Sequence, residues 1–241
     1  MESSTRRTVV RDSLGVAIAT GTYGLGFGAV GVASGLDVAQ TCVLSLLMFT
    51  GASQFALAGV LGSGGTPLAG ALAALLLGTR NTLYGLRLAP LLGYRGWRRA
   101  VAAHVLIDES TAMAVTRADR DLARTGFLVT GATIFVLWNL TTLAGAVAGE
   151  QLGDPRDLGL DAAVGAAFLA LLWPRLTTPL TRTVAVLAAL VAAGAVTVTP
   201  AGVPVLVAAG VAVLVGALTA RSSTGPDGPT EPTEPAEEVP A

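Results

Sequence analysis

The 241-residue chain has no lysine, one cysteine and one histidine, and only 13% of its residues are charged. The single cysteine, Cys42, excludes a disulfide within the chain and any cysteine-based metal site, and we interpret it as a small buried hydrophobic residue. The scarcity of charge, beside 52% hydrophobic residues and a mean hydropathy of +0.67, excludes an ordinary water-soluble domain. The sequence therefore predicts a membrane protein.

Long apolar windows take up most of the chain. A hydrocarbon layer about 30 Å thick needs about 20 apolar residues for each helical span. Such windows fall at residues 13–33, 38–62, 66–92, 100–116, 125–148, 160–174, 183–199 and 202–220. Backbone that touches lipid must be helical, because unpaired backbone groups cost several kcal/mol each in hydrocarbon. We expect an all-α, polytopic transmembrane helical bundle in the cell membrane, with about 7–8 membrane segments and room for broken or re-entrant ones.

The two ends of the chain differ from its apolar middle. Residues 1–12 carry adjacent arginines but no short apolar core before a cleavage site, so we interpret them as a cytoplasmic N-terminal segment. Residues 13–220 form the predicted transmembrane domain. Residues 221–241 are rich in Pro, Gly, Ser, Thr and Glu, and we expect an acidic, disordered tail. Because five of the sixteen acids lie in this tail, net charge says little about partners, and we expect no nucleic-acid partner.

The arginines give conflicting signals about topology. Short cytoplasmic loops retain arginine preferentially. If the N-terminus is inside and all the windows cross, most arginine-bearing joints also lie inside, but residues 93–99, with three arginines, lie outside. The conflict disappears if windows 66–92 and 100–116 are both re-entrant or broken. Both topologies stay open at this level.

Glycine and proline mark helix contacts and helix ends. Gly24 and Gly28 have the small-xxx-small spacing that lets two helices approach closely, and a locally unwound helix that lines a cavity is the alternative. Pro67 suits a helix start and Pro90 a helix stop.

The tripeptide Gly-Leu-Asp occurs at residues 35–37 and again at 159–161, each time at the start of an apolar window. Many transport proteins are built from repeated halves, but three matching residues also arise by chance. Asp37 and Asp161 are more simply interpreted as acids that stabilise the positive end of a helix dipole.

Polar and charged side chains interrupt three of the apolar windows. An ionised group at mid-bilayer costs about 2.5–3.5 kcal/mol, so such residues persist where they face a cavity, a partner charge or water. The residues are Thr50, Ser53 and Gln54 in the second window, Arg80, Asn81, Tyr84 and Arg87 in the third, and His104, Asp108 and Glu109 in the fourth. We expect Arg80 and Arg87 to meet the two acids, because paired charges are tolerated in a low-dielectric interior.

The only histidine and two adjacent acids share the stretch AHVLIDESTAM at residues 102–112. On a regular helix His104 and Asp108 share a face, whereas Glu109 points about 100° away. We therefore expect one acid to pair with His104 or an arginine and the other to face a pathway, where it can carry a proton. A purely structural ion pair that locks two helices is the alternative. Three ligands at these spacings are too few for a metal site, so we expect no metal and no cofactor.

Three segments resemble the signatures of one family. MFTGASQFALAG, LGTRNTLYGLRLAP and LIDESTAM resemble, in order and spacing, motifs of the AzlC family of branched-chain amino acid export permeases, over roughly residues 11–200. The resemblance implies export of leucine, isoleucine and valine, and in some members methionine, driven by the proton or membrane gradient. It also implies that the chain is not an enzyme, and that it is the large subunit of a two-component exporter whose partner is a small AzlD-type membrane subunit.

These positions make up a predicted site. Candidates for substrate binding are Gly51, Ser53, Gln54, Arg80, Asn81 and Tyr84, and candidates for proton coupling or ion pairing are His104, Asp108, Glu109 and Arg87. The carboxylate of an amino acid would meet Arg80 or a broken-helix N-terminus near Gly51, and its ammonium would meet Asp108 or Glu109.

The chain departs from the family pattern at Gly78 and Asn81, where relatives carry asparagine and a ring. If the second of these side chains touches the substrate in relatives, the substrate of this chain differs. Two other classes stay open: a transporter or channel for another small organic solute, and a non-catalytic scaffold subunit. A membrane enzyme is disfavoured, because the chain has one histidine and no defensible Ser-His pairing.

Overall fold

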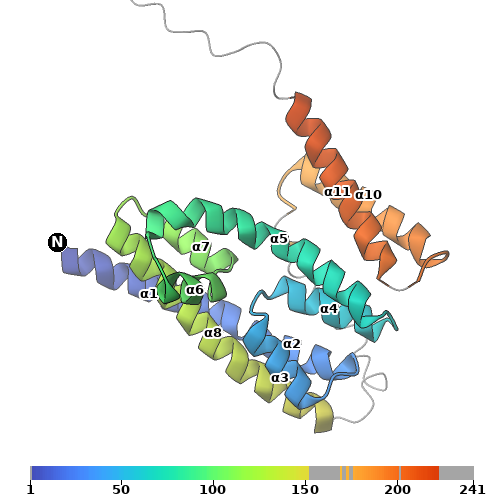
Figure 1. Ribbon diagram of the computed structural model, residues 1–241, viewed down its shortest axis with the longest axis horizontal. Coiled ribbons are helices and arrows are strands. Elements are labelled where there is room, and N and C mark those ends of the chain that lie inside the picture. The colour runs from blue at the N-terminus through green and yellow to red at the C-terminus, as the bar shows by residue number, and fades with distance from the viewer. Residues whose placement is uncertain (1, 152–168, 170–171, 174–175, 201, 223–241) are drawn as a thin grey trace, which may run out of the picture.

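The computed structural model describes residues 2–151, 169, 172–173, 176–200 and 202–222, and every regular element in those residues is a helix (Figure 1). The all-α prediction is therefore confirmed for the described part of the chain. Most of the predicted window at 160–174, the second Gly-Leu-Asp at 159–161 and the predicted tail beyond residue 222 lie outside the described residues.

The first apolar window folds as two consecutive helices, α1 (Glu2–Gly21) and α2 (Tyr23–Ala33), which pack against α8 (Arg120–Gln151). A Cβ atom at Gly28 would overlap the carbonyl oxygen of Thr142 on α8, so the two backbones touch at this point. The prediction that the glycines of this window serve close helix packing is confirmed. Because α1 begins at Glu2, residues 2–12 of the predicted N-terminal segment are helical as well.

The second window is not one helix. It is divided into α3 (Val38–Leu47) and α4 (Ala52–Gly62), and Gly51 between them has a φ of +60°, which residues with side chains rarely adopt. The carboxylate of Asp37 caps α3 by accepting a hydrogen bond from the Gln40 backbone N–H at 2.7 Å. The interpretation of Asp37 as a helix N-terminal acid is thus confirmed.

The pair α3/α4 enters and leaves the bundle at the same end. Helix α3 begins shortly after Ser34, which caps the end of α2. A Cβ atom at Gly62, the last residue of α4, would lie 3.0 Å from Ser34 Oγ. The pair folds back on itself at residues 48–51, and in this sense we call it re-entrant (Figure 1).

Helix α5 (Pro67–Leu92) runs along the bundle as one unbroken helix of 26 residues (Figure 1). The alternative in which this third window is re-entrant or broken is wrong. Pro67 occupies the first turn as predicted, whereas Pro90 lies inside the last turn and the helix ends at Leu92, followed by the capping residue Gly93 with a φ of +62°. The prediction of a stop at Pro90 is wrong by two residues, because the carbonyl groups of this last turn find partners on another helix.

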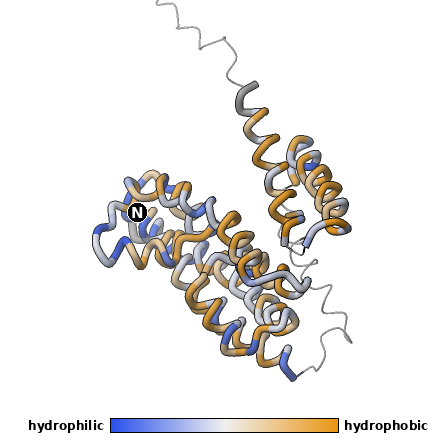
Figure 2. Tube along the Cα trace, turned by 45° about the vertical axis from the view of Figure 1, so that its right-hand side comes forward, coloured by the Kyte–Doolittle hydropathy of each residue, from blue (hydrophilic) through white to orange (hydrophobic). Residues whose placement is uncertain are grey.

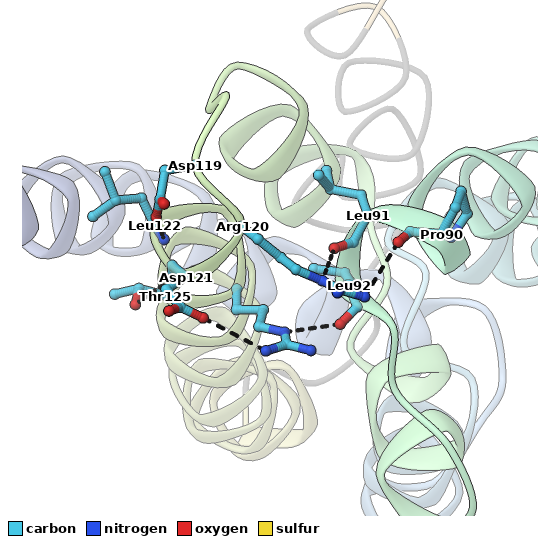
Figure 3. A network of polar contacts seen from close by, with 9 residues as sticks. Pro90, Leu91, Leu92, Asp119, Arg120, Asp121, Leu122 and Thr125 are labelled. Carbon is cyan, nitrogen blue, oxygen red and sulfur yellow. Dashed lines mark hydrogen bonds and ion pairs between the residues drawn. The ribbon is translucent and has the colours of Figure 1, made fainter.

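Figure 3 shows how the end of α5 is held. Arg120 Nε donates to the Leu91 carbonyl oxygen at 3.0 Å and its Nη2 to that of Pro90 at 3.4 Å, while Arg124 Nε donates to that of Leu92 at 2.8 Å. The last carbonyl groups of a helix lack partners within it, and positive charge at that end is favourable. The first turn of α8 thereby fixes the C-terminal end of α5.

The fourth window is divided into α6 (Trp97–His104) and α7 (Asp108–Val115). Ser110 holds the break: its hydroxyl donates to the Val105 carbonyl oxygen at 2.9 Å and accepts from the Ile107 backbone N–H at 3.0 Å. The residues between the two helices are not helical.

This break overturns the prediction that His104 and Asp108 share one face of a regular helix. The i, i+4 relation places two side chains together only while the helix continues between them, and residues 105–107 interrupt it. The two side chains therefore take separate directions on separate helices.

The pair α6/α7 is re-entrant from the opposite end of the bundle. Trp97 at the start of α6 and Asp119 just after α7 line one cavity together with Arg6 of α1. Residues 93–99 consequently lie at the same end as the N-terminus (Figure 1). The fourth window is broken as expected, and the second is broken in place of the third. With this arrangement the arginines of residues 93–99 lie at the same end as the N-terminus, and how the windows cross the membrane stays a prediction.

The helices α10 (Pro179–Val196) and α11 (Val203–Ser222) form a hairpin that contacts α5. Most of this hairpin is apolar and drawn in orange in Figure 2, and none of the residues of α10 is buried. By length and composition, three stretches of the described residues can cross a membrane: Thr5–Ala33, Arg120–Gln151 and Pro179–Val196. The chain is a helical membrane protein, and the count of about 7–8 segments stays a prediction.

Candidate functional site

An ion pair joins the middle of α5 to the first turn of α7. Arg80 Nη1 lies 2.9 Å from Asp108 Oδ2, and the two side chains are 24% and 21% exposed. A carboxylate at a helix N-terminus is also favoured by the helix dipole. Charge-assisted hydrogen bonds of this kind are stronger than neutral ones. The pair therefore ties the long helix α5 to the re-entrant pair α6/α7.

The start of α4 carries buried polar groups without partners. Gly51 precedes the helix and no side chain caps its first N–H groups. Ser53 is 2% exposed and Gln54 is fully buried, yet Ser53 Oγ and Gln54 Oε1 have no hydrogen-bond partner among the described residues. A buried polar atom left without a partner costs about 1–3 kcal/mol. Such groups call for an explanation, and a bound ligand is one.

The middle of α5 also lies against this helix start. A Cβ atom at Gly78 would lie 3.7 Å from Ser53 Oγ, and Arg80, which bonds Asp108, follows two residues later. Asn81 Oδ1 is buried next to the arginine and has no hydrogen-bond partner in the part of the chain that the structure describes. One short stretch of α5 thus faces the starts of both α4 and α7.

The turns of the two re-entrant pairs meet on α8. The Phe135 ring lies 5.1 Å from that of Phe49, in the turn between α3 and α4, and 5.4 Å from that of His104, at the end of α6. Ile107, in the turn between α6 and α7, belongs to the same core cluster as Phe49. The candidate site therefore lies where turns from opposite ends of the bundle approach each other.

The other predicted residues lie around the ion pair or outside it. Glu109 is half-buried in the first turn of α7, beside Asp108. Tyr84 packs one turn further along α5 against the core cluster that contains Leu106. Arg87 is exposed on α5, so the structure does not bring it into this group.

Two polar residues of this neighbourhood were missed by the sequence reasoning. Thr111 on α7 is 8% exposed, and its hydroxyl has no hydrogen-bond partner in the described residues. Asn139 on α8 donates from Nδ2 to the Phe135 carbonyl oxygen at 2.8 Å, while its Oδ1 is buried and likewise unpartnered there. Both sit inside apolar windows, so the rule that singled out Ser53 would have found them.

This geometry defines a class of protein. Broken helices that turn toward an ion pair in the middle of a helical membrane protein are the arrangement by which transport proteins surround a solute. Within the described ranges, no three His, Cys, Asp or Glu side chains lie together as metal ligands would.

The comparison with known families narrows this class. The family described as AzlC protein matches residues 15–152, more than half of the chain, and the chain belongs to this family. Membership confirms the resemblance seen in the sequence and supports a role in membrane transport of amino acids in general, in a family of transport proteins rather than enzymes. The matched residues contain both re-entrant pairs, and the hairpin α10/α11 lies beyond them. No curated protein and no solved structure matches the chain.

Proposed function

We propose that this chain is a permease that exports branched-chain amino acids, and methionine as a further substrate, coupled to the proton or membrane gradient. The observation that carries the proposal is the Arg80–Asp108 ion pair, placed between the starts of two broken helices. Its two charges are opposite in sign and fixed on separate elements. The solute that matches these two charges is one that carries a positive and a negative group on the same molecule.

A zwitterionic amino acid can exchange with this pair without leaving a charge uncompensated. Its carboxylate takes the place of Asp108 at the guanidinium of Arg80, and its ammonium takes the place of Arg80 at the carboxylate of Asp108. Because each charge of the protein keeps a partner, the exchange avoids the large cost of a lone buried ion. A solute with one charge would leave one member of the pair alone.

The start of α4 supports a second contact for the carboxylate. Uncapped N–H groups at a helix N-terminus attract anions, and the unpartnered hydroxyl of Ser53 is a hydrogen-bond donor beside them. The start of α7 carries Asp108 and Glu109 and suits the ammonium instead. The two helix starts thus have the opposite preferences that the two ends of an amino acid require.

Apolar walls and a second acid complete the proposal. Phe49 and Ile107 in the two turns are buried apolar residues against which a branched side chain can pack. Glu109 is the candidate for proton coupling, because it lies beside Asp108 in the same helical turn.

The proposal includes a partner. A small AzlD-type membrane subunit would complete the exporter, as the resemblance of the three sequence motifs implies. Co-expression of such a subunit with an affinity-tagged copy of this chain should give a complex that survives purification in mild detergent. Export that needs this chain alone would remove the partner from the proposal.

The test is an efflux assay in cells loaded with dipeptides of leucine, valine or methionine. Expression of the chain with its partner should lower the intracellular amino acid and raise it outside. The variants Asp108→Asn and Glu109→Gln should lose export while reaching the membrane in normal amounts. Asp12→Asn, on α1, where the acid pairs with Arg11 and Arg117, should keep export. Retained export in the double amide variant would remove the acids from the mechanism. A panel of small organic anions separates the alternative substrate class, since their efflux without that of leucine would replace the proposed substrate.

A further inference from the structure

A groove of about 820 Å³ runs beside the C-terminal half of α5, along α6 and the start of α8. Its volume lies within the roughly 300–1,000 Å³ of small-molecule pockets. Asn81 lines its inner end, next to the ion pair, and Arg95, Arg99 and Arg120 line its outer end near the start of α6. The groove therefore connects the N-terminal end of the bundle with the neighbourhood of Arg80.

The groove has charge of one sign only. Among the described residues that line it, three are arginine and none is aspartate or glutamate. Arg95 and Arg99 are exposed, whereas the guanidinium of Arg120 is held on the carbonyl groups at the end of α5 (Figure 3). The helix carbonyls hold Arg120 by dipoles and do not cancel its charge.

The neighbouring cavity on the other side of Tyr94 shows that this pattern is not general at this end of the molecule. That cavity, of about 1090 Å³, has Arg6, Arg98 and Arg124 in its wall, but Asp119 and Asp121 as well. Asp121 lies 3.5 Å from Arg124, so part of its positive charge is compensated. Of these two cavities, only the groove along α6 has a lining, among the described residues, in which the arginines face no acid.

The inner part of the groove changes from charged to apolar and then to polar. Leu88, Ala102, Leu106 and Phe127 form its apolar walls. At the inner end the buried Oδ1 of Asn81 has no hydrogen-bond partner within the described residues. A solute that is attracted at the mouth would pass an apolar wall and reach a polar group beside the guanidinium.

We propose that this groove is the vestibule through which a small carboxylate-bearing solute reaches Arg80 from the N-terminal end of the bundle. The proposal rests on the transport function proposed above and adds the route and the charge that selects the solute. A cleft lined by one sign of charge and walled by apolar groups focuses the field, which attracts anions, repels cations, and turns a zwitterion of no net charge so that its carboxylate enters first. Arg95 and Arg99 are the residues that set this selectivity, and Arg80 receives the carboxylate from them.

The first test measures the field of the groove without transport. In a Cys42→Ala background, Ala103→Cys places one thiol in the groove, because Ala103 lines it and is exposed. The purified protein is labelled with an anionic sulfonatoethyl and a cationic trimethylammonioethyl methanethiosulfonate. At low salt the anionic reagent should react about 10-fold faster, relative to free cysteine, and Arg95→Gln/Arg99→Gln should remove most of this preference, leaving the part that Arg120 contributes.

The matched control is Arg98→Gln, which removes an arginine of the same helix that lines the neighbouring cavity instead. It should leave the labelling preference unchanged. Equal rates for the two reagents in the parent protein would overturn the vestibule, and so would a preference that Arg98→Gln lowers as much as the double variant.

The second test separates this proposal from the proposed function. In the efflux assay, Arg95→Gln/Arg99→Gln should raise the KM for leucine about 2-fold or more and leave kcat unchanged, because the arginines orient the carboxylate of the zwitterion toward the site but do not bind it there. An unchanged KM would overturn the vestibule. Absence of leucine export by the parent chain, with the labelling preference intact, would overturn the proposed function and leave a vestibule for a different carboxylate.

Discussion

The two re-entrant pairs have the same construction and opposite chemistry. The pairs α3/α4 and α6/α7 each turn back inside the bundle and each place a helix start beside the middle of α5. The start of α4 has no acid, no capping side chain and buried polar atoms that find no partner among the described residues, whereas the start of α7 carries Asp108 and Glu109. Similar backbones thus present an anion-attracting end and a cation-attracting end to one place.

The turns themselves are built differently. Between α3 and α4 the chain turns through Gly51, whose φ of +60° depends on the absence of a side chain. Between α6 and α7 it turns through residues whose backbone groups are bonded by the hydroxyl of Ser110. One turn depends on backbone freedom and the other on one side chain, so each can be broken by a different substitution.

The largest effect is expected from removing one member of the ion pair. Arg80→Gln and Asp108→Asn should each abolish export and lower the thermal unfolding midpoint, because each leaves the opposite charge in a half-buried place without its ion pair. The double variant should recover much of the midpoint but none of the export. Arg87→Gln, on the exposed face of the same helix, is the control and should change neither. Efflux and unfolding in detergent are the measurements, and export by the double variant would contradict the role of the pair.

The next effect tests the turn between α3 and α4. Gly51→Ala should destabilise the protein by about 1–3 kcal/mol, because alanine must adopt a sparsely populated conformation at this φ. Gly26→Ala is the matched control, since a Cβ there meets nothing within 4 Å and its helical backbone accepts alanine. Chemical unfolding measures both. Equal stability of the two variants would show that the turn does not depend on glycine.

A smaller effect is expected at the other turn. Ser110→Ala removes the hydroxyl that bonds Val105 and Ile107, and it should cost about 1–2 kcal/mol because their backbone groups are left unpaired in a buried place. Ser63→Ala removes a serine hydroxyl that bonds the Gly59 carbonyl oxygen at an exposed helix end, and it should cost almost nothing. The same unfolding measurement applies, and a loss at Ser63 as large as that at Ser110 would refute this account of the break.

The smallest effect on stability, and the most specific, is expected at the start of α4. Ser53→Ala removes a hydroxyl without a partner, so the free energy of unfolding should stay the same or rise slightly, while the KM for leucine export rises several-fold. Ser45→Ala is the converse, because this buried hydroxyl donates to Thr142 Oγ1 at 3.3 Å. It should lower stability and leave KM unchanged. If both variants behaved alike, Ser53 would have a structural role only.

Local features of this fold could be predicted from the sequence, because short-range chemistry determines them. Asp37 caps a helix, and Pro67 begins one, since each acts within a single turn. The meeting of an arginine and an acid follows from the cost of lone charges in an apolar interior. A broken-helix N-terminus near Gly51 was expected as a place for the substrate's carboxylate, whereas the division of window 38–62 into two helices was not predicted.

The arrangement of the windows could not be predicted in full, because a hydropathy pattern stays apolar across a break of three residues in a helix. The break at 105–107 depends on Ser110, and the apolar run continues through it, so His104 and Asp108 were assigned to one helix face. The continuity of α5 through Pro90 depends on arginines far along the chain. The functional roles of the site residues stay predictions until the variants are measured.

Both turns pack against the ring of Phe135. This residue of α8 contacts Phe49 in the turn between α3 and α4 and His104 at the end of α6, so the two turns share one packing surface. A displacement of either turn alters the surface on which the other rests. Because both turns pack against this one ring, a movement of one turn acts directly on the other. Opposed movements of the two sides of a transporter would then need no further connecting element.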